Sequence, residues 1–83
     1  MKLTVRYFAS IREGLGLGHE QLETQAATLG ALRDELLARG GRYAELLAHG
    51  RAVRMALDQQ MCEASAPLHD GAEAAFFPPV TGG

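Results

Sequence analysis

The sequence predicts an α+β domain, because a segment with helical periodicity lies between segments that alternate as strands do. Apolar and polar residues alternate over residues 2–7, and residues 73–77 form a second strand-like segment near the C-terminal end. Between them, leucines recur three and four residues apart over residues 29–36. A period of two buries one face of a strand, whereas a period near 3.6 buries one face of a helix. A chain of 83 residues supports a single core, so these elements belong to one domain.

The N-terminal third predicts two strands joined by a loop. The odd positions of residues 2–7 are apolar and are expected to face the core. Residues 19–23 are expected to return as the second strand of a hairpin, after a loop at three alternating glycines, Gly14, Gly16 and Gly18. This glycine pattern lacks the P-loop lysine and the full dinucleotide spacing, and no helix follows it directly. We therefore interpret it as a turn and not as a phosphate loop.

Two helices are predicted in the middle of the chain. Thr28 is a good N-cap for the main helix, and Gly40-Gly41 is expected to end it. Its core-facing residues are Leu29, Leu32 and Leu36. A shorter repeat of the same kind, which closes at Gly50, predicts a minor second helix with Tyr43, Leu46 and Leu47 on one face.

The remaining residues predict three further strands. Val53, Met55 and Leu57 alternate as a third strand, and a short strand is expected at residues 61–63. Asp70-Gly71 is a turn sequence before the last strand, residues 73–77. A hairpin, a helix that crosses its face and later strands that complete a mixed sheet follow the order of the β-grasp architecture, which is an α+β fold.

Composition narrows the class of protein. The chain is 47% hydrophobic and 22% charged, as in an ordinary globular domain and unlike a disordered segment. A net charge of −2, with arginines spread along the chain, gives no reason to expect nucleic acid as a partner. Charged residues interrupt the N-terminal segment, so it does not resemble a secretory signal, and no apolar run suits a membrane span. A cytoplasmic protein without a membrane partner is expected.

Few side chains suggest catalysis or metal binding. Cys62 has no second cysteine to pair with and no neighbouring base, so we expect a small buried hydrophobe and not a nucleophile. The histidines sit in none of the usual zinc spacings and are expected to be exposed loop residues: His19, His49 and His69. No metal ligands are therefore predicted.

The C-terminal end is chemically the most distinctive segment. Gly82-Gly83 carries no side chains, so its backbone and carboxylate can enter a channel too narrow for other residues. Pro78 and Pro79 fix φ and lack N–H donors, which should end the last strand and direct the chain outward. We predict a β-grasp domain over residues 1–77 and an extended tail over residues 78–83, which could reach about 18 Å. The alternative is a frayed end of small residues.

Strand alternation also predicts a docking surface. Phe8 shares its strand face with polar residues, and Phe77 lies on the face opposite Ala74 and Phe76, so both phenylalanines are expected to point away from the core. Exposed aromatics at the root of a tail suggest an anchor for another protein. Met61 could complete this surface and Arg12 could add a polar contact at its rim. The alternative is that a loop of the same chain covers the phenylalanines.

Several motifs then resemble one known family, the small sulfur-carrying subunits of molybdopterin synthase, which are ubiquitin-like β-grasp proteins. The resemblance covers nearly the whole chain. Its marks are Tyr7-Phe8-Ala9 followed by Ile11-Arg12-Glu13, Leu32-Arg33, Pro67-Leu68 before Asp70-Gly71, and above all Phe76-Phe77-Pro78-Pro79-Val80-Thr81-Gly82-Gly83. Two positions depart from the family's pattern. Asp58 stands where relatives often carry Asn, and Ala72 stands where an acidic residue is common, which we expect to affect the loop near the partner.

The resemblance implies a carrier cycle. A ubiquitin-activating-like adenylyltransferase uses ATP to adenylate the carboxylate of Gly83, and a sulfur donor protein displaces AMP to leave a thiocarboxylate. The tail, Pro78, Pro79, Val80, Thr81, Gly82 and Gly83, then enters the large subunit, where sulfur passes to cyclic pyranopterin monophosphate and builds the dithiolene. The resemblance implies a heterotetramer of two small and two large subunits. It also implies no tightly bound cofactor on this chain, with the catalytic side chains on the large subunit.

Three alternatives remain at this point. The same fold and terminus serve sulfur carriers of other pathways, such as thiazole formation in thiamine synthesis. A ubiquitin-like modifier is a second alternative, although the chain lacks ubiquitin's Leu-Arg approach to Gly-Gly and has Lys2 as its only lysine. The third is a passive interaction domain. The mass of the terminus distinguishes them, since only a carrier exchanges a terminal oxygen for sulfur.

Overall fold

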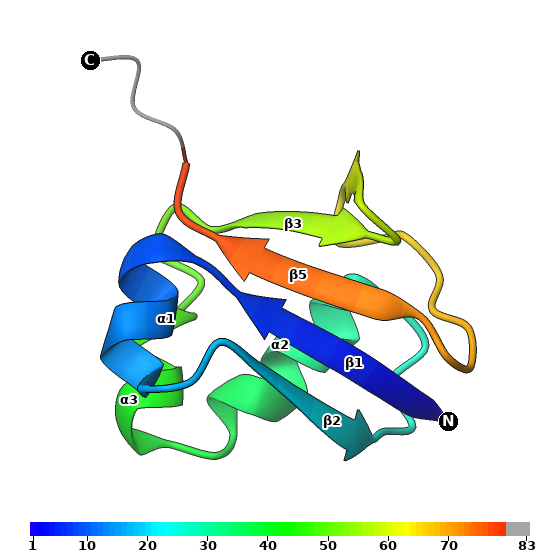
Figure 1. The fold of residues 1–83 in the computed structure, drawn as a ribbon, viewed down its shortest axis with the longest axis horizontal. Helices are drawn as coiled ribbons and strands as arrows, with labels where there is room; N and C mark the ends of the chain where they lie inside the picture. The colour runs from blue at the N-terminus through cyan, green and yellow to red at the C-terminus, as the bar shows by residue number, and fades with distance from the viewer. Residues whose placement is uncertain (80–83) are drawn as a thin grey trace.

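The computed structural model describes residues 1–79 and contains a mixed five-stranded sheet with three helices in that part of the chain (Figure 1). The strand order is β2-β1-β5-β3-β4. In chain order the elements are β1 (Lys2–Tyr7), α1 (Ala9–Leu15), β2 (His19–Glu23), α2 (Leu29–Leu37), α3 (Gly41–Leu46), β3 (Arg54–Leu57), β4 (Gln60–Cys62) and β5 (Glu73–Phe77). The predicted α+β class and β-grasp order are confirmed.

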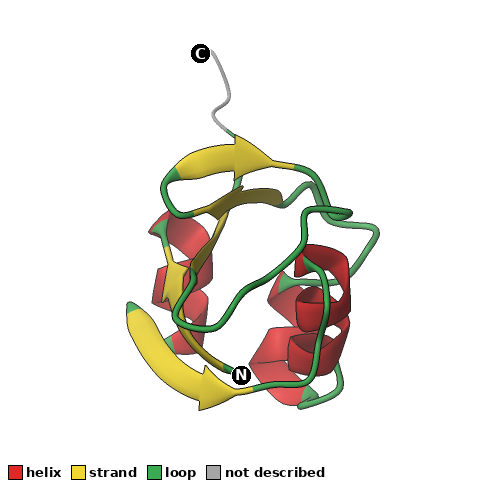
Figure 2. Ribbon diagram, turned by 90° about the vertical axis from the view of Figure 1, so that its right-hand side faces the viewer, coloured by secondary structure: helices red, strands yellow, loops and turns green. Residues whose placement is uncertain are grey.

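The two central strands run in the same direction. β1 pairs in parallel with β5 and antiparallel with β2, while β3 lies antiparallel to both β5 and β4. The sheet curves around the core, with a helix on its concave side (Figure 2). Because β1 and β5 are adjacent and parallel, their C-terminal ends meet at one edge of the molecule. The N-terminus lies at the other end of the sheet (Figure 1).

Local sequence explains the core elements. Leu3, Val5 and Tyr7 are all buried in the core, as the alternation predicts. The Thr28 hydroxyl accepts a hydrogen bond from the Ala31 N–H at 3.2 Å, which confirms it as the N-cap of α2. The leucines of α2 at positions 29, 32 and 36 are likewise buried against the sheet. The main helix therefore follows from its cap and its period.

The expected loop around residues 14–18 is wrong in part, because α1 occupies Ala9–Leu15. The helix is short, contains Gly14 and has no side-chain cap, so local propensity is weak. Tertiary packing compensates: Ile11 is buried, and a Cβ on Gly14 would lie 2.5 Å from a Leu46 methyl group. Gly14 therefore permits close approach of α1 to α3. Gly16 ends α1 in the left-handed region, at φ 79°.

Other boundaries differ from the prediction by a few residues. α2 ends at Leu37, and Gly40 instead precedes α3 as its N-cap. β3 begins at Arg54 and β4 at Gln60, one residue away from the expected positions. β5 matches its predicted bounds. His19 begins β2, so it is exposed but is not a loop residue.

Arg33 has a structural role that the sequence pattern did not indicate. Its side chain is only 7% exposed, although it is charged. Its Nε donates a hydrogen bond to the carbonyl of Leu47 at 2.7 Å, and its Nη2 donates to the carbonyls of Ala48 at 2.6 Å and Arg51 at 3.3 Å. Carbonyls after the last turn of a helix lack intrahelical partners. The Arg33 guanidinium thus caps the C-terminal end of α3 and ties the following loop to α2.

We expect Arg33→Ala to lower the free energy of unfolding by about 3 kcal/mol, because it leaves carbonyl groups around a buried site without their charged donor. Arg33→Lys keeps the charge but lacks the planar guanidinium, so its free energy of unfolding should lie between those of the parent and Arg33→Ala. Urea unfolding measures both variants. An Arg33→Ala stability within about 0.5 kcal/mol of the parent, the range of neutral surface changes, would contradict this role.

A second polar cluster joins β1, β2 and α3. The hydroxyls of Tyr7 and Tyr43 both donate to Glu20 Oε2 at 2.8 Å, and Arg39 donates to Oε1 at 2.9 Å. Burial would raise the pKa of Glu20, but the hydrogen bonds from Arg39, Tyr7 and Tyr43 outweigh it and lower that pKa. Burial and the bond to Glu20 raise the pKa of Tyr7. Since every member has a partner, the cluster is structural.

Candidate functional site: the root of the C-terminal tail

The C-terminal segment follows directly from a central strand. β5 ends at Phe77, and the half-buried Pro78 and Pro79 come next. The end of β5 lies away from the N-terminus, beside the end of β1 (Figure 1). The predicted roles of Val80, Thr81, Gly82 and Gly83 concern positions outside the described residues. The described site is therefore the surface from which the tail departs.

Two aromatic side chains lie at this root. Phe8 is 45% exposed, whereas its neighbour on β5, Phe76, is completely buried. Phe77 is half-buried and packs edge-on against Phe8, with ring centroids 6.2 Å apart and planes at 87°. The Phe8 N–H donates to the Phe76 carbonyl at 3.2 Å, which extends the pairing of β1 and β5 by one residue. The expected outward orientation of Phe8 and Phe77 is confirmed.

A row of apolar residues on the outer face of the sheet leads from β5 to β4. Strand register aligns Ala75 of β5 with Ala56 of β3, and Ala56 with Met61 of β4. Met61 is 58% exposed, so no loop of the described chain covers this end of the surface. We call Phe8, Phe77, Ala75, Ala56 and Met61 the outer patch. Its large side chains stand at its two ends, and the two alanines between them are buried, with 8% of Ala75 and 7% of Ala56 exposed.

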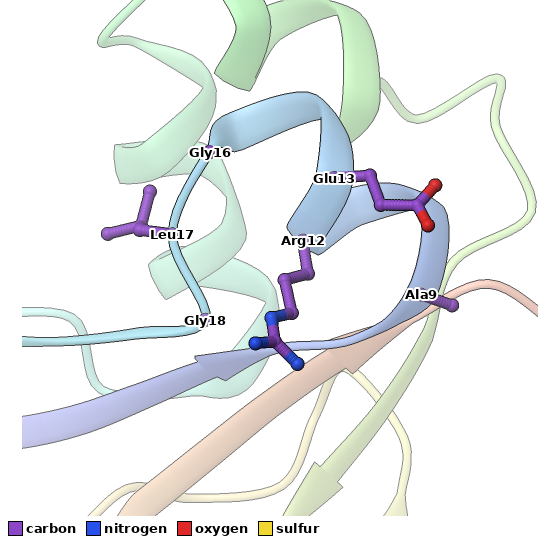
Figure 3. A pocket seen from close by; sticks show the side chains of 6 residues that line it. All are labelled: Ala9, Arg12, Glu13, Gly16, Leu17 and Gly18. Atoms are coloured by element: carbon purple, nitrogen blue, oxygen red, sulfur yellow. The ribbon is translucent and has the colours of Figure 1, made fainter.

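Arg12 does not join Met61 on this surface. Its side chain lies over the segment that enters β2, where a Cβ on Gly18 would be 3.1 Å from Arg12 Nε. It lines a shallow pocket with Ala9, Glu13, Gly16, Leu17 and Gly18 (Figure 3). This pocket lies on the β2 side of β1, whereas Phe77 and Met61 lie on the β5 side. Arg12 is therefore near the outer patch only through the position of Phe8 directly before α1, and its predicted role at the rim stays a prediction.

The two unusual positions, Asp58 and Ala72, lie at the opposite end of the sheet from the tail, because Leu57 pairs with Ala74. They are therefore distant from the root of the tail, and the expectation that they affect the loop near the partner stays a prediction. Asp58 has a positive φ of 50°, which Asp tolerates better than most residues, and its Oδ1 accepts the Glu73 N–H at 3.0 Å. Ala72 is completely buried, so an acidic side chain could not occupy its position without a buried partner.

The histidines make pairwise contacts. His69 Nδ1 lies 3.1 Å from the Asp70 carbonyl and Nε2 lies 2.7 Å from Asp58 Oδ2. Both partners accept hydrogen bonds, so the two contacts together favour the doubly protonated ring. The Asp58 carboxylate accordingly raises the pKa of His69. His49 contacts Asp34 at 2.6 Å. Within residues 1–79 no group of His, Cys, Asp and Glu has the arrangement of a metal site.

Two further observations bear on the sequence predictions. Cys62 is half-buried and packs against the core cluster, in line with a structural role. No helix in the described part of the chain has the length and apolarity needed to cross a membrane.

The mixed sheet in this order, with α2 packed across it and the C-terminal segment leaving from β5, defines a ubiquitin-like β-grasp protein. The crystal structure of SAMP1 from Haloferax volcanii has the same fold, with a TM-score of 0.79 over all of both chains at 21% identity. The model of the ThiS family matches residues 5–83, and the chain belongs to that family.

Two of the proteins that this chain resembles match nearly its whole length. The molybdopterin synthase sulfur carrier subunit of Haemophilus influenzae is 40% identical, over 98% of this chain and 99% of that protein. A chain in the complex of subunits 1 and 2 of the molybdopterin-converting factor from Helicobacter pylori is 28% identical, with a TM-score of 0.71 and complete coverage of both chains.

Proposed function

We propose that this protein is the sulfur carrier subunit of a molybdopterin synthase. The observation that carries the proposal is the match of nearly the whole chain to the Haemophilus influenzae carrier subunit, together with a family match that extends through residue 83. The geometry supports it, because the segment that ends in Gly83 departs beside a pair of aromatic rings, the exposed Phe8 and the half-buried Phe77. A carrier needs these two parts: an end that holds sulfur and a surface by which partners recognise it.

In this proposal the reacting group is the carboxylate of Gly83. A carboxylate is a poor acyl donor, so an activating adenylyltransferase joins it to AMP at the expense of ATP and releases pyrophosphate. A sulfur donor protein then supplies the sulfur that displaces AMP, which leaves a thiocarboxylate. Inside the large subunit this sulfur attacks cyclic pyranopterin monophosphate, and hydrolysis of the acyl–sulfur bond returns the carboxylate. The chain supplies the carried group, and the partner supplies the catalytic side chains.

The outer patch is the proposed docking surface for the large subunit. In this proposal Phe8, Phe77 and Met61 provide apolar contact area, and Arg12 of α1 adds a polar contact at the rim. Aromatic residues at the centre of an interface often dominate its energetics. The Helicobacter pylori complex holds subunits 1 and 2 of the molybdopterin-converting factor together, which supports a large-subunit partner. We extend the proposal to a heterotetramer of two small and two large subunits in the cytoplasm.

Intact-mass analysis of the protein purified from cells that make molybdenum cofactor tests the proposal. We expect a fraction of the chains to carry sulfur in place of one terminal oxygen. That fraction should disappear when the activating enzyme is deleted, because no acyl adenylate then forms. A branched peptide that links Gly82-Gly83 to a lysine of another protein would instead indicate a modifier. A terminus that stays unmodified in sulfur-replete cells would overturn the proposal.

A further inference from the structure

The distribution of lysine and arginine bears on the chemistry of an activated terminus. Of the eight lysine and arginine residues in the chain, Lys2 is the only lysine and the others are arginines. An acyl adenylate or thioester reacts with amines, and an amine tethered within reach competes at an effective concentration on the order of millimolar. A lysine close to the root of the tail would therefore capture the activated Gly83. This inference rests on the proposed function, in which Gly83 is activated.

Arginines occupy the positions around the tail root. Arg54 pairs directly with Phe77 across β3 and β5, and its side chain is exposed. Arg6 pairs with Ala75 and holds Glu73 at 3.0 Å, and the exposed Arg12 follows Phe8 on α1. A guanidinium stays protonated near neutral pH, so it carries positive charge without a free amine. The surface around the root is thus cationic and poor in nucleophiles.

Lys2 lies at the far end of the sheet. It begins β1, whose six residues span about 20 Å at roughly 3.3 Å per residue. Because β1 and β5 are parallel, that length separates Lys2 from the end of β5. Residues 78–83 reach about 18 Å in polyproline geometry. They would approach Lys2 only if the chain reversed at Pro78-Pro79 and ran back along the sheet.

We propose that the placement of arginine at the tail root, with the single lysine at the opposite end, prevents the activated Gly83 from acylating its own chain. Arg54 is the residue on which this selectivity depends most, because it lies nearest to the root. The reaction avoided is attack of a lysine Nζ on the Gly83 carbonyl carbon. The bond to the leaving group breaks, the leaving group takes the amine's proton, and an internal isopeptide bond forms. A carrier closed in this way could no longer be discharged in a partner.

A transposed variant isolates position from composition. Lys2→Arg combined with Arg54→Lys has the same composition, mass and charge as the parent, and moves only the amine. Both proteins are prepared as residues 1–83 with a chemically installed C-terminal thioester of 2-mercaptoethanesulfonate. Attack by the amine releases the thiol and yields a lactam that is one water lighter than the hydrolysed protein. Both proteins have the same N-terminal α-amine, so any lactam that it forms is a common background. The rate of thioester hydrolysis is measured in both proteins, and equal rates show that the two thioesters are equally reactive.

We expect the transposed variant to form at least about tenfold more lactam than the parent, with a branched peptide that joins position 54 to Gly83. Equal lactam in both proteins, or lactam in neither, would overturn the inference. Circular dichroism confirms that both proteins are folded. Because the thioester is installed without cellular enzymes, this outcome is independent of the sulfur found or not found on the terminus in cells. Failure of the inference is therefore distinguishable from failure of the proposed function.

Discussion

A chain extended by one alanine after Gly83 should support no molybdoenzyme activity in cells that lack their own copy of the carrier. The extension converts the Gly83 carboxylate into an amide, which has no free oxygen to attack ATP. It also places a methyl side chain beyond the two glycines, where a channel shaped for backbone alone would exclude it. Both effects act before sulfur transfer, so activity should fall to the level of the empty-vector strain. Nitrate reductase activity in cell extracts is a suitable measurement.

The matched control adds the same alanine at the N-terminus, which lies at the other end of the sheet (Figure 1). This variant has the composition of the first one and should restore activity. Immunoblotting checks that both proteins accumulate equally. If the C-terminally extended chain restored normal activity without loss of its alanine, the Gly83 carboxylate could not be the reacting group.

Phe77→Asp should weaken binding to the large subunit by at least about 30-fold, which corresponds to the roughly 2 kcal/mol that defines a hot spot. The substitution places a charge in the middle of the aromatic pair and removes the edge-on contact with Phe8. Phe77 lies on the outer face at the end of β5, and its inward neighbour Phe76 fills the core, so the core should remain intact. Isothermal titration with the large subunit measures the loss.

Gln21→Asp is the control for the added charge. Gln21 is exposed and pairs with Thr4, so it lies on the same face of the sheet but on edge strand β2, away from the outer patch. It should bind the large subunit as the parent does. Thermal unfolding of both variants separates binding from stability. Unchanged affinity in a folded Phe77→Asp variant would show that the outer patch is not the docking surface.

The local sequence pattern was sufficient to predict an element when the residues that specify it lie within that element or next to it. Thr28 and the leucines that follow it specify α2, and alternation specifies the inward residues of β1. It was insufficient for α1, because Gly14 lowers helix propensity and the compensating contact with Leu46 comes from a distant part of the chain. Arg33 was missed as a structural residue for the same reason, since its three carbonyl partners lie 14 to 18 residues away. The docking roles of Phe8, Arg12, Met61 and Phe77 remain predictions.

The sequence by itself determined the chemistry of the C-terminal segment and the inward and outward faces of each strand, because both depend on residue type and on a period of two. Only the tertiary structure decided which outward residues meet. The insertion of β5 between β1 and β3 brings Phe8 beside Phe77, extends the row of apolar residues to Met61, and separates Lys2 from Arg54 by the length of the sheet. Strand order depends on pairing between segments far apart in the chain, which no local pattern encodes.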